Sequence, residues 1–257
     1  MANNNRVRDN RRYFTVTTTE VKGDDDNGEE VYRYRLMRIW NQNQRPLLII
    51  GCNPSTANAM SGDPTMDKVS NIAMANGYGG VIMSNLYAFR ATDPTVMKAR
   101  GRGDLQYVIG HNGTNILRNN LNLIDLDEAS GLVNDVVFAY GNIGVRNWGE
   151  DQNYVNQYPE QLKELLLNQG KSLYAFDLTK FGHPGHPLPR SNQFADDFQK
   201  YEWAKWHCYD VQQNLWRWQK WSCHDVTNDR WQLRYWDTNQ WINVVTGAGR
   251  PALPGVQ

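Results

Sequence analysis

Four short apolar runs, separated by segments with helical spacing, limit most strongly how this chain can fold. They cover residues 47–51, 81–86, 133–140 and 172–178, and helical patterns at 65–76, 104–123 and 159–168 lie between them. The run at 47–51 is continuous, which is typical of a strand buried on both faces, and the other three are strand candidates that include polar residues. Alternation of such strands with helices predicts a mostly parallel central sheet with helices on both faces. We therefore expect an α/β fold, a three-layer sandwich.

Three domains are expected from shifts in composition along the chain. Residues 1–30 are rich in Asn and Arg and then acidic, which predicts a flexible N-terminal segment with one short strand at 13–19. Residues 31–197 form the α/β domain, which begins with a period-two strand at 31–40. Residues 198–257 hold most of the ten Trp residues and form a separate module.

The C-terminal module contains an internal repeat. The segment 205–211 (KWHCYDV) recurs as 220–226 (KWSCHDV), a period of fifteen residues. Self-similar strand-like units with turn residues between them predict a small antiparallel β meander. Its Trp side chains either form the core of the module or provide a stacking surface for bases or sugar rings. Because a small sheet is marginally stable alone, we expect the meander to dock on the main domain or to mediate homo-oligomers.

Bulk properties exclude several classes of protein. The formal net charge is +0, so the chain has no global basic field for non-specific nucleic-acid binding. No apolar run reaches the length of a signal peptide or a membrane span, so we expect a cytoplasmic protein without a membrane partner. Three cysteines are too few for a disulfide scaffold. The tail contains two neighbouring His and Cys pairs, 207–208 and 223–224. Within each pair the two side chains point to opposite faces of a strand, so we expect no zinc site. We expect no cofactor either.

Polar residues follow three of the apolar runs, where ligands bind in open α/β sheets. Asn53 lies in the string GCNPST (51–56), where Pro54 stiffens the loop, so its amide is a candidate to orient a water molecule. Ser55 and Thr56 on the same loop are candidate ligand-binding residues. The alternative for Asn53 is an ordinary role as a turn or cap residue. Asp63 or Thr65 is expected to be the N-cap of the next helix, or, if Asp63 turns inward, it is a candidate general base.

The second motif begins at Asn85, near the end of the run 81–86. An amide offers a donor and an acceptor side by side, which matches the edge of a pyrimidine. Tyr87 or Phe89 are candidates to stack on that ring, and Arg90 to bind a phosphate. Alternatively, the two aromatic residues belong to the core and Arg90 pairs with Asp93.

The third motif is the string HPGHPLPR, residues 183–190. Three prolines stiffen this loop, so its histidines are held in place rather than free. His183 and His186 are therefore candidates to donate a hydrogen bond to a developing anion. Arg190 at the end of the loop is a candidate ligand-binding residue.

The segments 32–40, 51–56, 63–65, 77–80, 85–94, 139–141 and 178–187 resemble, in order, a family of uncharacterised bacterial and phage proteins, the domain of unknown function sixteen-forty-three. The resemblance covers residues 31–190, and the Trp-rich tail lies outside it. That family has no settled activity, so the resemblance implies no function for this chain. If the chain is encoded by a phage, we expect it in the cytoplasm of the host.

The order Gly-x-Asn-Pro, Asn and His-Pro-x-Pro-Arg also resembles the uracil-DNA glycosylases. That resemblance implies that Asn53 positions the attacking water, Asn85 reads the base and His186 supports a flipped nucleotide. Ser55 stands where those enzymes usually have Gly. The implied fold is a uracil-DNA glycosylase-like sandwich followed by the meander.

These patterns predict a glycosylase-like hydrolase that acts on a base in DNA or on a free nucleotide. Its partners would be a nucleobase, a nucleotide or single-stranded, flipped-base DNA. Two alternatives stay open. One is a non-catalytic phage protein that binds nucleotides or nucleic acid, blocking a defence or sequestering a signal. The other is an assembly protein that uses the Trp repeats.

Overall fold

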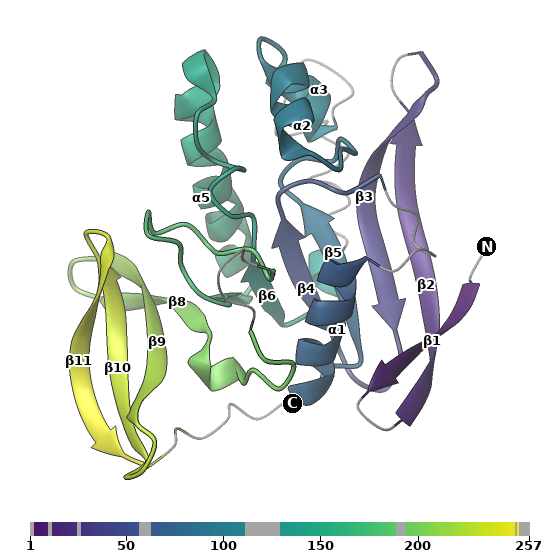
Figure 1. The fold of residues 1–257 in the computed structure, drawn as a ribbon. Coiled ribbons are helices and arrows are strands. Elements are labelled where there is room, and N and C mark those ends of the chain that lie inside the picture. Colours follow the sequence, from purple (N-terminus) through teal and green to yellow (C-terminus); the bar gives the residue numbers. More distant parts are fainter. Residues whose placement is uncertain are drawn as a thin grey trace.

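A computed structural model describes residues 3–9, 12–24, 27–56, 63–110, 129–188, 194–249 and 251. Its strands form one sheet of eleven, in the order β1-β2-β3-β5-β4-β6-β7-β8-β9-β10-β11 (Figure 1). The strands are β1 (Asn3–Asp9), β2 (Arg12–Asp24), β3 (Glu30–Ile39), β4 (Pro46–Gly51), β5 (Gly80–Asn85), β6 (Asp135–Phe138), β7 (Ser172–Ala175), β8 (Ala204–Asp210), β9 (Leu215–Asp225), β10 (Arg230–Asp237) and β11 (Gln240–Ala248). The α-helices are α1 (Pro64–Ala75), α2 (Pro94–Gly101), α3 (Leu105–Ile109) and α5 (Gln152–Asn168), and short 3-10 turns are η1 (Gly149–Asp151) and η2 (Lys200–Glu202).

The sheet is mixed and mostly antiparallel, so the expected three-layer α/β sandwich with a mostly parallel sheet is wrong. Parallel pairing joins β5 to β4, β4 to β6 and β6 to β7. The other described neighbours are antiparallel, including β3 with β5 and β7 with β8. The outer strands of the parallel set, β5 and β7, each have one edge whose backbone N–H and C=O groups need hydrogen-bond partners. A strand of either direction can supply those partners. Apolar patterning identified the four parallel strands but not the partners at their edges.

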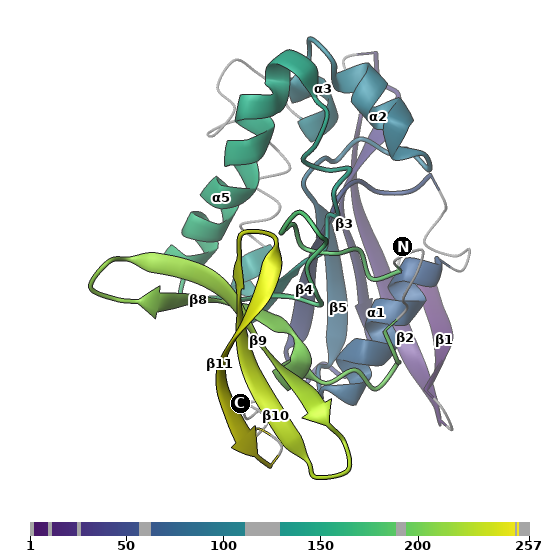
Figure 2. The same cartoon turned by 60° about the vertical axis from the view of Figure 1, so that its left-hand side comes forward.

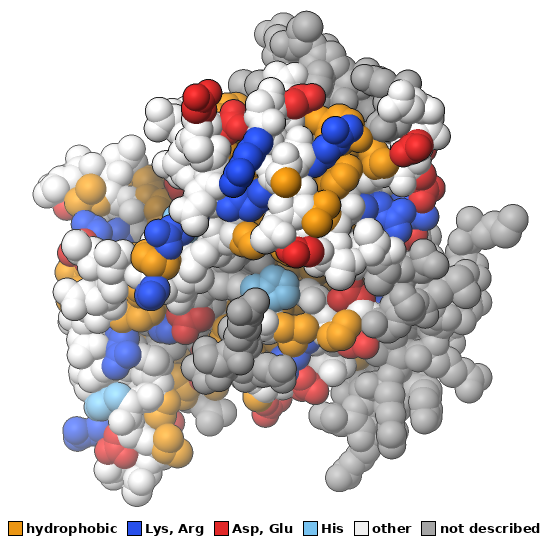
Figure 3. Space-filling view, turned by 45° about the horizontal axis from the view of Figure 1, so that its top comes forward, with side chains coloured by type: hydrophobic (Ala, Val, Ile, Leu, Met, Phe, Trp, Pro, Cys, Tyr) orange, Lys and Arg blue, Asp and Glu red, His pale blue; other side chains and the backbone are white. Residues whose placement is uncertain are grey.

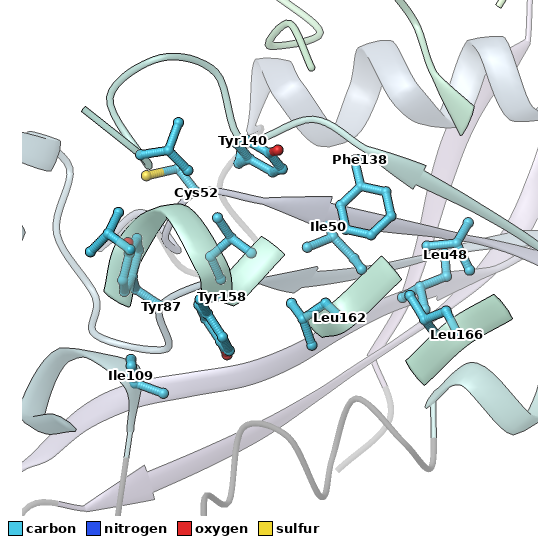
Figure 4. Packing of buried hydrophobic residues seen from close by; sticks show 14 of the residues in the cluster. Leu48, Ile50, Cys52, Tyr87, Ile109, Phe138, Tyr140, Tyr158, Leu162 and Leu166 are labelled. Carbon is cyan, nitrogen blue, oxygen red and sulfur yellow. The ribbon is translucent and has the colours of Figure 1, made fainter. Parts of the chain in front are cut away.

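Alternate residues of β4 bury against opposite faces of the sheet. Leu48 and Ile50 belong to the cluster that contains the apolar side chains of α2, α3 and α5. Figure 4 shows both residues facing Leu162 and Leu166 of α5. Leu47 and its neighbours of the same parity pack instead with α1. Because side chains alternate along a strand, one apolar run supplies both cores.

The helices begin and end where local chemistry requires it. Asp63 caps α1 and Pro64 occupies the first turn of that helix. Helix α3 ends at Gly110, whose φ of 90° lies in the left-handed region that suits glycine. The helix expected over 104–123 is therefore short, and its remaining residues lie outside the described part of the chain. Helix α5 starts earlier than residue 159, with Pro159 in its interior.

The Trp-rich segment forms an antiparallel meander of β8, β9, β10 and β11, as the repeat predicts, and it continues the main sheet through β7 (Figure 2). Asn214, Asp229 and Asn239 adopt positive φ at its turns. Trp218 and Trp231 are buried, whereas Trp216 is 37% exposed. The ammonium of Lys163 on α5 lies 3.9 Å from the Trp206 ring centroid, so a cation–π contact helps to dock the meander.

The N-terminal residues extend the opposite edge of the sheet. Strands β1 and β2 lie within the segment that we expected to be flexible, and β2 includes the strand expected at 13–19. Strand β2 pairs with β3, which pairs in turn with β5. None of the helices in the described ranges combines the length and apolarity that a membrane crossing requires.

Candidate functional site

A cavity of about 1090 Å³ lies where the parallel strands β4, β5, β6 and β7 end. Its lining includes Asn53, Asn85 and His186, one residue from each of the three sequence motifs. Figure 3 views this end of the molecule, where a histidine side chain lies in a hollow between hydrophobic and acidic side chains. Strand-end loops meet here because parallel strands present their carboxyl ends at the same edge.

The amide of Asn53 is held in one orientation. Its Nδ2 donates hydrogen bonds to the carbonyl of Ala91 at 2.7 Å and to that of Pro54 at 3.2 Å. The backbone N–H of Ala91 donates in turn to the Pro54 carbonyl at 2.9 Å. Since a carbonyl accepts only from the NH₂ side of an amide, Asn53 Oδ1 is the atom with which this side chain accepts a further hydrogen.

Asn85 ends β5 and is 4% exposed. Its Oδ1 lies over Gly51, where an added Cβ would stand only 2.6 Å away. Glycine at position 51 thus leaves the space that the Asn85 amide occupies. The two motifs are also joined through the backbone, because the N–H of Leu86 donates to the Gly51 carbonyl at 3.0 Å.

The His loop, residues 183–188, is tied to two strand-end loops. The N–H of Gly185 donates to the Asp177 carbonyl at 2.7 Å, and the N–H of Gly141 donates to the Pro184 carbonyl at 2.8 Å. His186 Nδ1 accepts from the N–H of Leu188 at 3.1 Å, so in the neutral ring the proton is on Nε2. The His186 side chain keeps an exposed edge, yet the surrounding walls limit its solvation and lower its pKa.

Asp63 lines the cavity but serves as the N-cap of α1. Its Oδ1 accepts from the N–H groups of Thr65 at 2.8 Å and Met66 at 3.3 Å. Its Oδ2 lies 3.4 Å from the hydroxyl of Ser55, which also lines the cavity. The capping interpretation of Asp63 is thus confirmed. The hydroxyl of Thr56 instead bonds to that of Thr92, beside the cavity.

The aromatic residues of the second motif lie in the core and not in the cavity lining. The hydroxyl of Tyr87 donates to the Gly144 carbonyl at 2.7 Å, and its ring stacks on Trp148 at 5.0 Å. Phe89 packs against Tyr32 and Tyr107. The backbone N–H groups of Tyr87 and Ala91 donate to the loop that follows β4. Neither ring lines the cavity, so the expected stacking role for these two rings has no geometric support.

The remaining candidates do not join the cavity either. Arg90 forms an ion pair with Glu30 at 3.1 Å rather than with Asp93, which caps α2. His183 lines a neighbouring cavity of about 490 Å³. Arg190 lies outside the described residues. Residues of one motif therefore do not all share a site. His183 and His186 belong to the same loop, yet they line different cavities.

Sequence reasoning missed other residues of the lining, notably Arg33, Tyr140, Asp177 and Phe194. Arg33 is 4% exposed and pairs with Glu20 at 3.2 Å, and burial lowers its pKa. Asp177 follows β7 as Asn53 follows β4, so the rule that sites lie at strand ends could have found it. No comparable signal marks Phe194, which reaches the cavity from a later segment.

Cys52 lines the cavity without being a nucleophile. Its side chain is 7% exposed, and burial raises the pKa of its thiol to about 12. Only the thiolate is a strong nucleophile, so this sulfur is inert near neutral pH. The polar groups of the lining include amides, hydroxyls, one imidazole, the cations of Arg33 and Lys180, and two carboxylates that are already engaged.

The fold and the cavity together define a mixed α/β protein with a pocket at its strand ends that is lined by both apolar and polar side chains. The chain belongs to the family described as protein of unknown function (DUF1643), whose model matches residues 33–188. No curated protein and no solved structure matches the chain. The matched range contains the first two motifs and residues 183–188 of the third, and it ends before the Trp-rich meander begins.

Proposed function

We propose that this protein is an N-glycosidic hydrolase that acts on a nucleobase in DNA or in a free nucleotide. The observation that supports the proposal best is that Asn53, Asn85 and His186 line one cavity of about 1090 Å³. That volume is in the range of small-molecule sites and accommodates a base with its sugar. The ordered motifs that resemble the uracil-DNA glycosylases give the same assignment of roles.

In this mechanism each group has one task. Asn53 Oδ1 accepts a hydrogen from the attacking water and so orients its oxygen toward the sugar C1′. Asn85 pairs with the amide edge of the base. As the water oxygen bonds to C1′, the glycosidic bond breaks and its electron pair leaves with the base. His186 stabilises that negative charge as a neutral donor through Nε2–H, and the water proton passes to solvent.

A second candidate function is binding without turnover. It is favoured by the state of the carboxylates, because both that line the cavity in the described ranges are engaged. Asp63 accepts two backbone N–H groups, and Asp177 accepts Lys220 Nζ at 2.7 Å. Neither is therefore ready to act as a general base toward a water held by Asn53.

Base release distinguishes the two functions. Oligonucleotides containing uracil or modified bases, and free nucleotides, are incubated with excess protein, and released base is measured by chromatography. The hydrolase predicts release that falls by about two to three orders of magnitude in Asn53→Ala and His186→Gln. Asn41→Ala, in an exposed turn, is the matched control. Calorimetric binding with all ligand recovered intact would instead support the binding function.

A further inference from the structure

The second cavity, of about 490 Å³, is built beside the first and shares Tyr140 with it. His183 lines it, three residues before His186 in the same Pro-stiffened loop. The rest of its lining comes from the loop after β6 and from α5, and is mostly polar: Val145, Arg146, Asn147, Gln152, Asn156, Pro159 and Glu160.

Arg146 carries the positive charge in the lining of this second cavity. Its guanidinium carbon lies 3.6 Å from the centroid of the Phe181 ring, so the aromatic face holds the planar group in place. In the described ranges no carboxylate forms an ion pair with Arg146. A guanidinium held on an aromatic face keeps its N–H groups directed outward, where they bind oxygen anions bidentately.

The loop that carries Arg146 is anchored to α5. Gln152 Nε2 donates to the Val145 carbonyl at 2.7 Å, and Gln152 Oε1 accepts from the N–H of Trp148 at 3.1 Å. The carbonyl of Arg146 itself accepts from Lys98 Nζ. These bonds fix the loop on both sides of Arg146, so the cavity does not have to be ordered when a ligand arrives.

The charges around the cavity favour an anion. Glu160 is the acidic residue of the lining, and its carboxylate is neutralised by Lys163 at 2.7 Å. Burial lowers the pKa of His183, and the charges of Arg146 and Lys163 lower it further, whereas Glu160 raises it. An anion placed between Arg146 and His183 would offset the repulsion that the guanidinium exerts on the protonated ring.

We propose that this second cavity is a phosphate subsite in which Arg146 and His183 bind the phosphate of the nucleotide whose base enters the first cavity. The inference rests on the proposed function for the identity of the base, and narrows its substrate to phosphorylated nucleotides. The phosphate is either the monoester of a free nucleotide or a diester of a strand, since both present the same oxygens.

The first test follows the His183 imidazole by NMR while inorganic phosphate is added. Phosphate raises the pKa of His183 in the native protein, because a neighbouring anion favours the charged ring. Arg146→Gln removes this response. The matched control is Arg100→Gln, because the Arg100 guanidinium also stacks on an aromatic ring, Tyr107 at 4.3 Å, but lines neither cavity. A His183 pKa that phosphate leaves unchanged overturns the proposal.

The second test compares a deoxynucleoside, its 5′-monophosphate and a single-stranded oligonucleotide by calorimetry. The monophosphate or the strand binds at least about tenfold more tightly than the nucleoside, and Arg146→Gln removes that advantage. A stronger response to the monophosphate or to the strand identifies the source of the phosphate. Equal binding of all three overturns the subsite but leaves base release, the test of the proposed function, unaffected. A phosphate preference without base release supports the subsite and the binding function.

Discussion

Lys220 on β9 donates to both carboxylate oxygens of Asp177, at 2.7 and 2.8 Å. Asp177 lines the cavity, and its own carbonyl accepts from Gly185, next to His186. The indole of Trp241 lies 4.5 Å from Lys220 Nζ and orients it. Through this pair the Trp-rich meander, which lies beyond the range matched by the family, reaches the wall of the site. A second contact follows from Gly182, where a Cβ would stand 2.7 Å from Trp236 Nε1.

Lys220→Gln is therefore expected to loosen the His loop while the sheet stays folded. The pair is partly exposed, so the free energy of unfolding falls by only about 1 kcal/mol. The NMR signal of the His186 ring shifts, and the affinity for a nucleoside monophosphate falls. The control is Arg217→Gln, which breaks a 3.0 Å pair with Asp237 inside the meander and away from the cavity. Identical His186 signals in both variants would refute the link.

Gly51→Ala is expected to displace the Asn85 side chain. The added Cβ would stand 2.6 Å from Asn85 Oδ1, closer than real Cβ contacts allow, and Asn85 is buried. Overpacking of this kind costs about 1–3 kcal/mol of stability, and the displaced amide no longer pairs with a base. Urea unfolding and calorimetry measure the two effects. Gly131→Ala, a helical position with no atom within 4 Å of the added Cβ, should not lower the stability and should leave binding unchanged.

Acidification is expected to destabilise the protein through its two loop histidines. Both His183 and His186 have pKa values below their ordinary value of 6.5. Between these lowered values and 6.5 the unfolded chain binds more protons than the folded one, so stability rises with pH across that window and is level above it. Protonation of His186 Nδ1 also removes the acceptor for Leu188.

Urea unfolding of the double variant His183→Gln, His186→Gln measures this effect. Its stability should depend less on pH between about 5 and 7 than that of the native protein. His207→Gln, on an exposed position of β8, serves as the control and should keep the native slope. Parallel curves for the native protein and the double variant would show that these histidines do not couple to folding.

Tyr87→Phe is expected to affect stability and not ligand binding. The lost hydroxyl leaves the buried Gly144 carbonyl without its 2.7 Å donor, which costs about 1–3 kcal/mol. The stacking of the ring on Trp148 is retained. Chemical denaturation and calorimetry with a nucleoside monophosphate measure both quantities. A weaker affinity at unchanged stability would assign Tyr87 to the ligand site after all.

Local patterns predicted much of the secondary structure and part of the site. Apolar runs located β4, β5, β6 and β7, since burial on both faces leaves a mark in the residues themselves. The fifteen-residue repeat located the meander, since similar strand-like units with turn residues between them recur along the sequence. Polar residues at or just beyond the ends of those runs identified Asn53 and Asn85, because a strand end determines the edge at which its loop emerges.

Pairing at the sheet edges was decided only in the tertiary structure. Backbone N–H and C=O groups are the same in every residue, so the sequence did not indicate that β3 and β8 would flank the parallel strands in antiparallel orientation. The direction of individual side chains in the loops also depended on distant partners. Asp63 turned to cap α1, Tyr87 turned to the Gly144 carbonyl, and His183 faced a different cavity from His186. The sequence by itself determined which segments become strands and which polar residues lie at their ends. Long-range packing and hydrogen bonding determined which of those residues share a site.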